Sequence, residues 1–237
     1  MRRRFFVDAF EADRAVLTGE VAHHLGRVLR AEPGQIYELS DGNSVWLAKI
    51  EGASKERVEF SLVEPVPVRV SSLDKTLLVA VVKFDAFEWA LEKATELGIN
   101  RIVPLAAARS EKGLLTAAAK RADRWRKIAF EASQQSRRVR LPLVSDLLNP
   151  EAAFRECAAS LKLMLSERAD APVLREILQG QNAKSVSLAV GPEGGWTEGE
   201  FSAAQNAGFK EASLGRLILR TETAVTAGLA AVNYALE

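Results

Sequence analysis

Short apolar runs alternate with amphipathic segments through the C-terminal two thirds of the chain, and this alternation restricts the fold most. Residues 76–82 form a continuous apolar run, typical of a strand buried on both faces. Residues 84–97 follow with helical periodicity and stop at Gly98, a residue type that commonly ends helices. Strands alternating with helices predict an α/β fold with a mostly parallel sheet. By the same criteria we expect strands at 101–105, 161–165 and 186–190, and helices at 120–136, 172–178, 197–207 and 222–236.

The N-terminal part has a different pattern, dominated by short strands. Two strand-like runs, 35–40 and 45–50, flank Asp41-Gly42-Asn43, which is a hairpin signal. Further strands are expected at 4–8 and 57–63, and a helix at 20–30. Short strands with one helix suggest a small β-rich barrel. Pro65-Val66-Pro67 favours an extended linker, so we expect one domain at 1–68 and a second at 69–237.

Composition narrows the class of protein. A net charge of +1 with 48% apolar residues describes a globular chain with a substantial core and excludes a polycation. Cys157 is the single cysteine, so we expect no disulfide within the chain. Because the chain has only two histidines, we expect no metal site either. No apolar run approaches the ~18–20 residues that a membrane span needs. We therefore expect a cytoplasmic protein without a membrane segment.

A glycine-rich segment, Gly191-Pro192-Glu193-Gly194-Gly195-Trp196-Thr197, directly follows the strand expected at 186–190. Glycines let the backbone approach a ligand closely, and α/β proteins bind ligands at the carboxyl ends of parallel strands. Thr197 and Glu200 form a capping-box pattern that opens the next helix. The Lys-Ser/Thr end of a P-loop is missing. The segment therefore predicts a ligand-binding loop, although a tight strand-to-helix turn could use the same glycines.

A second segment, 214–224, combines Gly215 with an apolar stretch and a polar cluster that opens the last helix. We expect Thr221 to be the N-cap, where the free N–H groups of the first turn could bind an acceptor. Ordinary capping of a C-terminal helix is the alternative. Capping requires Thr221 alone, however, and explains neither Arg220 nor Glu222.

Positive charge is concentrated in two places that the balanced net charge conceals. From Lys120 to Arg140 there are eight Lys or Arg and two acids, which favours contact with phosphates. Gln134 and its polar neighbours strengthen this RNA-binding interpretation. Either concentration could also be an ordinary solvated surface. The second one, in the N-terminal part, consists of Arg2, Arg3, Arg4, Arg14, Arg27 and Arg30 beside His23 and His24.

Five segments in a fixed order resemble the ribosomal RNA small subunit methyltransferase E family over nearly the whole chain. The resemblance lies in their sequence and their order together, which is far more specific than any one of them. Trp196 departs from the family pattern, because a phenylalanine is common there. The segments are His23-His24-Leu25-Gly26-Arg27-Val28-Leu29-Arg30, Glu92-Lys93-Ala94-Thr95-Glu96-Leu97-Gly98, Glu131-Ala132-Ser133-Gln134-Gln135-Ser136-Arg137-Arg138, Gly191-Pro192-Glu193-Gly194-Gly195 and Leu219-Arg220-Thr221-Glu222-Thr223-Ala224.

The resemblance implies a SPOUT-type fold: a parallel α/β sheet with a C-terminal trefoil knot, which sequence patterns would not predict because knotted chains are very rare. It also implies a PUA-like N-terminal domain, a homodimer, and S-adenosylmethionine as the cofactor. The implied reaction is methylation of N3 of uridine 1498 in 16S rRNA of the small ribosomal subunit. Carried over by motif, the cofactor pocket would be lined by Leu165, Ser166, Glu167, Val190, Gly191, Pro192, Glu193, Gly194, Leu214, Gly215, Leu217, Leu219, Arg220, Thr221 and Thr223.

The implied chemistry needs a proton acceptor, because uridine N3 carries a proton and is a poor nucleophile while neutral. Glu193, Glu222 or Glu131 could act as the general base. Arg220 could stabilise negative charge on the uracil oxygens, with Arg137 or Arg138 of the partner subunit as a second choice. The expected RNA-binding residues are Arg2, Arg3, Arg4, Arg27, Arg30, Arg124, Gln134, Arg137 and Arg138.

Two other functions stay open at this point. One keeps the fold and cofactor but changes the RNA target or product, for example to a ribose 2′-O or a guanine in transfer RNA. The other is a non-catalytic RNA-binding factor in ribosome assembly, which would bind RNA without a cofactor. A nucleotide hydrolase is disfavoured because the P-loop ending is missing.

Overall fold

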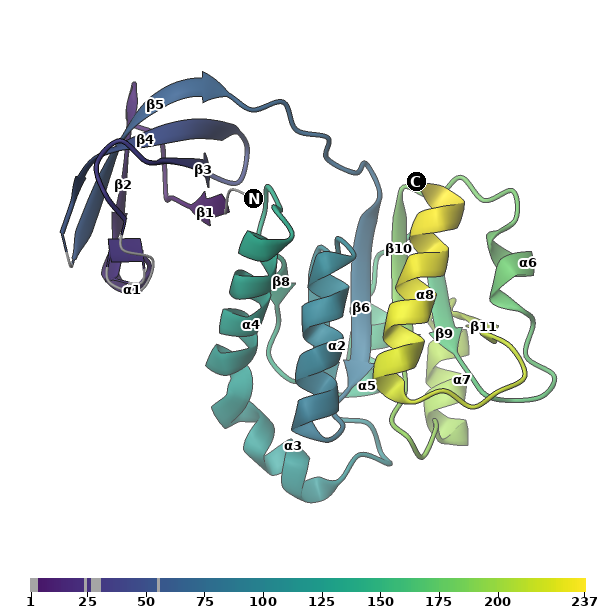
Figure 1. The fold of residues 1–237 in the computed structure, drawn as a ribbon. Helices are drawn as coiled ribbons and strands as arrows, with labels where there is room; N and C mark the ends of the chain where they lie inside the picture. The colour runs from purple at the N-terminus through teal and green to yellow at the C-terminus, as the bar shows by residue number, and fades with distance from the viewer. Residues whose placement is uncertain (1–3, 24, 27–30, 55) are drawn as a thin grey trace. The chain divides into compact units, whose positions relative to one another are not determined.

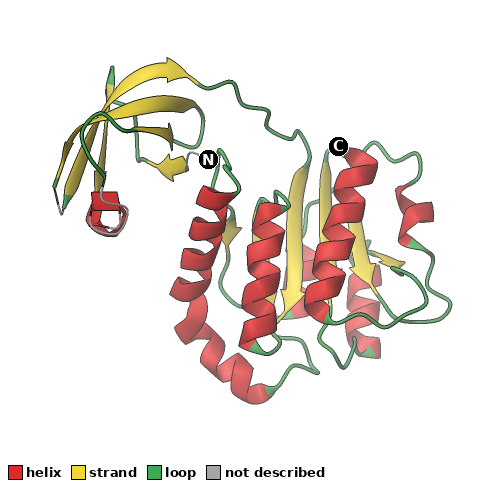
Figure 2. Cartoon of the chain, viewed as in Figure 1, coloured by secondary structure: helices red, strands yellow, loops and turns green. Residues whose placement is uncertain are grey.

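The computed structural model describes residues 4–23, 25–26, 31–54 and 56–237. The chain divides into two compact units (Figures 1 and 2). The N-terminal unit comprises Met1–Val70 together with Ser133–Leu141, and the C-terminal unit comprises Ser71–Ala132 together with Pro142–Glu237. In neither unit is any described helix long and apolar enough to cross a membrane.

A five-stranded sheet in the order β1-β3-β4-β5-β2 forms the N-terminal unit. β1 pairs in parallel with β3, and the other neighbours are antiparallel. Phe5, Leu39, Ile50 and Phe60 lie at the centre of its apolar core. The elements are β1 (Arg4–Phe6), β2 (Arg14–Thr18), α1 (Gly19–His23), β3 (Ile36–Ser40), β4 (Val45–Ala53) and β5 (Arg57–Pro65).

The hairpin predicted around Asp41 is confirmed. β3 and β4 pair on either side of it, and the Asp41 carboxylate accepts the backbone N–H groups of Asn43 and Ser44, each at 2.8 Å. The helix expected at 20–30 appears as α1 only, and residues 24 and 27–30 of that prediction lie outside the described residues. β2 was not predicted.

A segment distant in sequence, Ser133–Leu141, belongs to the N-terminal unit. The Ser40 hydroxyl donates to the Val139 carbonyl at 2.8 Å, and Arg140 Nε donates to the Gly42 carbonyl at 2.6 Å. Arg137 has a left-handed backbone, with φ of 56°, where the chain leaves its helix. The basic stretch after residue 136 is therefore held on the β3–β4 hairpin, although the division at residue 68 had placed it in the other domain.

The C-terminal unit contains a six-stranded sheet in the order β11-β9-β10-β6-β7-β8, and every neighbouring pair is parallel. The predicted parallel α/β fold is thus confirmed. Two predicted strands, 101–105 and 161–165, have the observed bounds. The strands are β6 (Asp74–Ala80), β7 (Arg101–Leu105), β8 (Leu143–Val144), β9 (Leu161–Leu165), β10 (Ser185–Val190) and β11 (Lys210–Ala212).

Helices cover both faces of this sheet. α2 and α8 lie side by side on one face, where Leu77, Phe87 and Leu229 share an apolar core, while α5 and α7 lie behind the strands (Figure 1). Leu78 and Phe154 belong to the second core, on the α5–α7 face. The helices are α2 (Phe84–Glu96), α3 (Lys112–Ala118), the 3-10 turn η2 (Ala119–Arg121), α4 (Ala122–Gln135), α5 (Pro150–Glu156), α6 (Leu174–Leu178), α7 (Glu198–Asn206) and α8 (Thr221–Leu236).

A buried lysine in β6 contacts the carboxyl-terminal ends of α2 and α8. Lys75 in β6 donates from Nζ to the Leu97 carbonyl at the end of α2 and to Asn233 Oδ1 in α8. The same Nζ lies 2.6 Å from Glu237 Oε1 in an ion pair. A cation near helix carboxyl ends is favourable because the last carbonyls carry partial negative charge.

Candidate active site

A cavity lies at the carboxyl ends of three neighbouring strands, β9, β10 and β11. Its volume is about 570 Å³, counting its open mouth. Each strand contributes the segment that follows it, because parallel strands bring their carboxyl ends to one edge. The lining residues are Leu165, Ser166, Glu167, Val190, Gly191, Pro192, Glu193, Gly195, Trp196, Ser213, Leu214, Gly215, Leu217, Ile218, Leu219, Thr221 and Ala224.

Hydrogen bonds between side chains and backbone join the three segments. The Thr221 hydroxyl donates to the Gly191 carbonyl at 2.9 Å, and Trp196 Nε1 donates to the Leu165 carbonyl at 3.0 Å. Both side chains are buried. The predicted capping role of Thr221 is therefore wrong: Arg220 is the N-cap of α8, without a side-chain cap bond. The Thr221 hydroxyl is used across the cavity instead.

Two positions in the loop after β10 favour glycine, Gly191 for lack of space and Gly195 mainly for its backbone conformation. A Cβ on Gly191 would lie 3.0 Å from the Trp196 ring, closer than ordinary contact. Gly195 has a φ of +69°, and a Cβ there would collide with the Glu167 carboxylate. Glycine at these two positions lets the loop pass close to Trp196 and Glu167, which line the cavity with it.

The loop is also fixed from behind. The capping box predicted at α7 is confirmed, because Thr197 and Glu200 exchange hydrogen bonds. Glu200 is buried, and its second oxygen accepts the Ala108 N–H at 2.9 Å. Arg109 NH1 donates to the Gly194 carbonyl at 2.6 Å. A loop held at this many points is pre-organised for a ligand.

Sequence comparisons place the chain among RNA methyltransferases. The profile of an RNA methyltransferase domain matches residues 69–233, and that of an RNA methyltransferase PUA domain matches residues 17–63. A ribosomal RNA small subunit methyltransferase E of Synechocystis sp. is 36% identical, covering 93% of this chain and 73% of the relative. The chain belongs to the ribosomal RNA small subunit methyltransferase E family. A Bacillus subtilis member of this family is 31% identical, covering 99% of this chain and 97% of its own.

Solved structures agree with this membership. A methyltransferase E from Neisseria gonorrhoeae, bound to S-adenosyl methionine, is 31% identical with a TM-score of 0.89 and covers 100% of this chain and 98% of its own. A putative methyltransferase from Legionella pneumophila, in complex with the same cofactor, is 29% identical with a TM-score of 0.89 and covers 99% and 98%. The arrangement of both units' elements is therefore that of the family.

Most of the residues expected to hold the cofactor in this methyltransferase E family member line the cavity. Gly194, Arg220 and Thr223 are not among the lining residues, although each is next to one in sequence. Sequence reasoning missed Gly195, Trp196, Ser213, Ile218 and Ala224 as lining residues. Gly195 and Trp196 stood within the motif that had been singled out. Ile218 and Ala224 belong to the segment 214–224, which also stood out in the sequence. Ser213 carried no signal, since it is an ordinary residue of a loop whose path depends on the fold.

The expected catalytic residues are distributed unequally around the cavity. Glu193 lines it and is exposed. Arg220 is exposed at the start of α8, and Glu222 is half-buried in the first turn. In the described part of the chain, no group of three or more His, Cys, Asp or Glu side chains could hold a metal ion. The polar side chains that line the cavity include the carboxylates of Glu167 and Glu193 and the hydroxyl groups of Ser166 and Ser213.

The expected RNA-binding residues differ in burial and in whether an acidic side chain already pairs with them. Arg4 is buried and pairs with Glu38 at 2.8 Å, so its charge already has a partner inside the N-terminal unit. Arg124 is exposed but pairs with Glu88 in α2 at 2.8 Å. Burial lowers the pKa of Arg138 to about 10, which leaves it charged at neutral pH. Arg2, Arg3, Arg27 and Arg30 lie outside the described residues.

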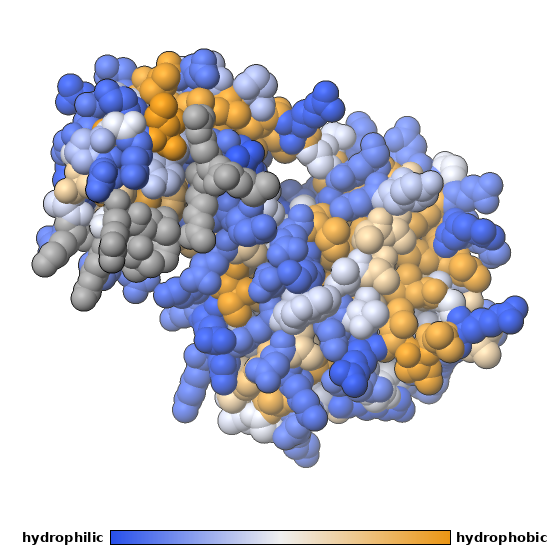
Figure 3. All heavy atoms as spheres, in the orientation of Figure 1, coloured by the Kyte–Doolittle hydropathy of each residue, from blue (hydrophilic) through white to orange (hydrophobic). Residues whose placement is uncertain are grey.

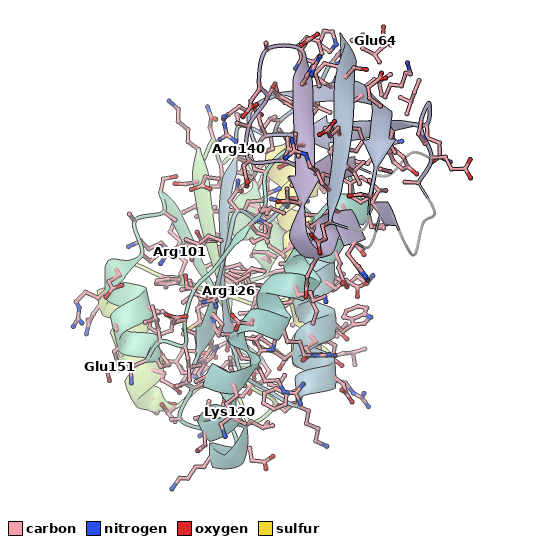
Figure 4. The ribbon with its side chains drawn as sticks, turned by 90° about the vertical axis from the view of Figure 1, so that its left-hand side faces the viewer. Glu64, Arg101, Lys120, Arg126, Arg140 and Glu151 are labelled. Carbon is pink, nitrogen blue, oxygen red and sulfur yellow. The ribbon has the colours of Figure 1, made fainter. Side chains whose placement is uncertain are left out.

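The described part of the basic stretch runs along η2 and α4, where Lys120 and Arg126 lie on the same helical stretch (Figure 4). Arg126 pairs with Asp123 at 3.0 Å and with Asp146 at 2.8 Å. Gln134 is half-buried near the end of α4, and Arg137 is exposed just beyond it. Some of the positive charge on α4 is therefore balanced by acidic side chains of the C-terminal unit. The arginines after residue 136 belong to the N-terminal unit.

Proposed function

We propose that this protein binds S-adenosylmethionine in the cavity at the carboxyl ends of β9, β10 and β11 and methylates N3 of uridine 1498 in 16S rRNA. Membership of the family supports the methyltransferase activity and the small-subunit substrate. The single observation that carries the placement is the convergence of three adjacent backbone loops on one cavity.

The lining residues suit this cofactor. Apolar side chains, among them Leu165, Val190 and Leu214, offer flat contact for an adenine ring. Glycine at 191 and 195 lets the loop after β10 pack closely against Trp196 and Glu167, and peptide groups of this loop would supply hydrogen bonds to the cofactor. Ser166 and Glu167 add side-chain acceptors for ribose hydroxyls. When bound, S-adenosylmethionine supplies the methyl group from its sulfonium centre.

The chain's own residues then have to activate the acceptor. Uridine N3 must lose its proton, and we assign Glu193 as the first candidate for general base because its carboxylate lines the cavity. Glu222 is the second candidate. Arg220, which directly precedes the lining residue Thr221, would stabilise the negative charge that develops on a uracil carbonyl oxygen. A base reaching such a cavity has to leave its stack first.

RNA contact is assigned to the PUA-type N-terminal unit and to the stretch held on it. Arg137, Arg138 and Arg140 come together there on the β3–β4 side of the unit. Arg2, Arg3, Arg27 and Arg30 add charge in the same part of the sequence. These contacts would bind phosphates and thereby set the position of the strand, while the cavity selects the base.

We further propose a homodimer, a C-terminal trefoil knot and a cytoplasmic location. Large apolar side chains are exposed around the cavity loop and on α8: Leu217 is 82%, Ile218 80% and Tyr234 95% exposed. An apolar area is visible on the face of the C-terminal unit that carries α8 (Figure 3). Exposed apolar area of this kind favours a second copy as its partner.

The experiment that tests the function is methyl transfer from labelled S-adenosylmethionine to small ribosomal subunits that lack this modification. Naked rRNA and transfer RNA serve as parallel substrates, and the labelled nucleoside is identified by mass spectrometry. We expect 3-methyluridine in the small subunit. Label in another nucleoside would keep the cofactor and overturn the product. No label, from protein that still binds the subunit, would favour a non-catalytic assembly factor.

A further inference from the structure

A second loop stands beside the cofactor loop at the same edge of the sheet. Residues 106–110 follow β7, which is separated from β10 by β6 alone. Ala107 is buried in the α5–α7 core, and the Ala106 N–H donates to the Leu148 carbonyl at 2.8 Å. The Ala108 N–H is held by Glu200. Residues 106–108 of this loop are therefore fixed, and Arg109 follows directly after them.

Arg109 lies against the glycine loop. A Cβ on Gly194 would meet the Arg109 side chain at 3.3 Å from Cβ and 3.4 Å from Cδ, so the stem runs along the bare backbone of that glycine. NH1 donates to the Gly194 carbonyl. This contact uses one of several guanidinium N–H groups and sets the direction of the others.

The charge of Arg109 is not neutralised in the described part of the chain. The side chain is exposed, and no ion pair engages it there. Glu198, at the start of α7, is paired with Arg168. The pKa of Glu198 is lowered first by that hydrogen bond and to a smaller degree by the charge of Arg109, so the acid is already committed. A rigid, exposed and unpaired guanidinium therefore stands beside the cavity wall.

We propose that Arg109 binds a phosphate group of the RNA strand at the mouth of the cavity. This proposal rests on the function proposed above. When a base enters a pocket, its phosphates stay outside at the rim. A planar guanidinium with parallel N–H groups matches a phosphate better than a point charge does. Arg109 would then be a substrate-positioning residue, with Gly194 keeping its guanidinium in place.

The rival role for Arg109 is to brace the glycine loop only, and the two roles predict different measurements. Arg109→Met removes the charge and the bond to Gly194, while Arg109→Lys restores a charge. Arg101→Met is the matched control, because Arg101 is an exposed arginine at the opposite edge of the sheet and donates to Ser145 Oγ. Binding of small ribosomal subunits lacking the modification is measured at several salt concentrations, at constant Mg²⁺, and S-adenosylmethionine affinity is measured by calorimetry.

For Arg109→Met we expect subunit binding to weaken about tenfold and the slope of log affinity against log salt to fall in magnitude by about 1, as for one lost phosphate contact. Arg109→Lys should recover the slope, and Arg101→Met should match the wild type. Loss of the bond to Gly194 should lower cofactor affinity by no more than about fivefold in Arg109→Met and Arg109→Lys, and Arg101→Met should leave it unchanged. An unchanged slope, with or without a loss of cofactor affinity, overturns the proposal.

The binding slope needs no turnover, so this test is independent of the reaction. If the wild type forms 3-methyluridine but the slope is unchanged, the Arg109 proposal alone fails. If the wild type transfers no methyl group yet the slope falls, the proposed reaction fails and the phosphate contact stands.

Discussion

The two edges of the parallel sheet in the C-terminal unit each border a cavity, and the two cavities offer a ligand very different surfaces. The carboxyl-edge cavity, at about 570 Å³, is walled by backbone loops after three strands. The amino-edge cavity is larger, at about 930 Å³, and its lining includes the strand starts Asp74, Arg101 and Ser185 and, beyond α5, Cys157. Size alone would favour the second.

Polar groups at the amino edge are largely engaged with each other. Asn100 Oδ1 accepts the Lys75 N–H at 3.0 Å, and Ser185 Oγ accepts the Ser160 N–H at 2.8 Å. Such contacts fix the strand starts. At the carboxyl edge, three loops converge on the cavity, and glycine lets the loop after β10 pass close to Trp196. The convergence of three cross-linked loops, rather than cavity volume, therefore marks the binding edge of this sheet.

The largest expected effect is a loss of stability, and it comes from a substitution at the amino edge. Lys75→Met should lower the free energy of unfolding by about 2–3 kcal/mol, because it leaves Glu237 without its cation. This loss is smaller than for a fully buried ion pair, because Glu237 is partly solvated. Denaturant unfolding measures this loss. Cofactor affinity of the folded protein should not change, and a large loss of it would contradict the division of roles between the edges.

The same pair gives a pH dependence. Burial raises the pKa of Glu237, but hydrogen bonds from Lys75 and Ser71 and the Lys75 charge outweigh it and hold the pKa below 4.5. A lowered acid pKa stabilises the folded state above the unfolded value and stops doing so as pH falls through the folded value. Wild-type stability should therefore fall more steeply below about pH 4.5 than that of Glu237→Gln. Equal slopes for both proteins would rule out this linkage.

At the carboxyl edge, Gly191→Ala should act on binding. The added Cβ, 3.0 Å from the Trp196 ring, has to displace the loop at a cost of about 1–3 kcal/mol, which corresponds to cofactor binding that is about 5- to 150-fold weaker. Gly199→Ala is the matched control, since a Cβ there meets nothing within 4 Å. Calorimetry with S-adenosylmethionine compares the two. Equal affinity for both variants would show that the close packing of Gly191 on the Trp196 ring is not needed for cofactor binding.

Thr221→Val sharpens the same point with a smaller change. It removes one buried hydrogen bond to the Gly191 carbonyl, worth about 1 kcal/mol, so cofactor affinity should fall about fivefold. Thr226→Val is its control, because the Thr226 hydroxyl donates only to the Glu222 carbonyl within the same helix. If both substitutions weaken binding equally, the cross-link to Gly191 has no special role.

The smallest expected effect is at Cys157 in the amino-edge cavity. Cys157→Ser changes one lining atom and nothing at the carboxyl edge, so methyl transfer and cofactor affinity should stay within about twofold of the wild type. Steady-state transfer assays measure this. A loss of tenfold or more would mean that the larger cavity takes part in the reaction.

Local sequence signals predicted much of the C-terminal unit. The capping box at Thr197 and Glu200, the glycine ending α2 and the bounds of β7 and β9 depend on neighbouring residues, which a sequence displays directly. Long-range partners were not predictable. The Thr221 hydroxyl bonds Gly191, thirty residues away, and not its own helix. Arg4 pairs with Glu38, and residues 133–141 belong to the N-terminal unit. Each of these contacts depends on tertiary packing that no local pattern encodes.

The measurement that separates the two edges most directly is hydrogen exchange of the amides with and without S-adenosylmethionine, read by mass spectrometry. We expect the cofactor to slow exchange in peptides covering residues 165–167, 191–196 and 213–221, since their backbone lines the carboxyl-edge cavity. Peptides covering 74–76, 100–101 and 156–159 should exchange unchanged. Protection of the amino-edge peptides, with none at the glycine loop, would contradict the assignment of the binding site.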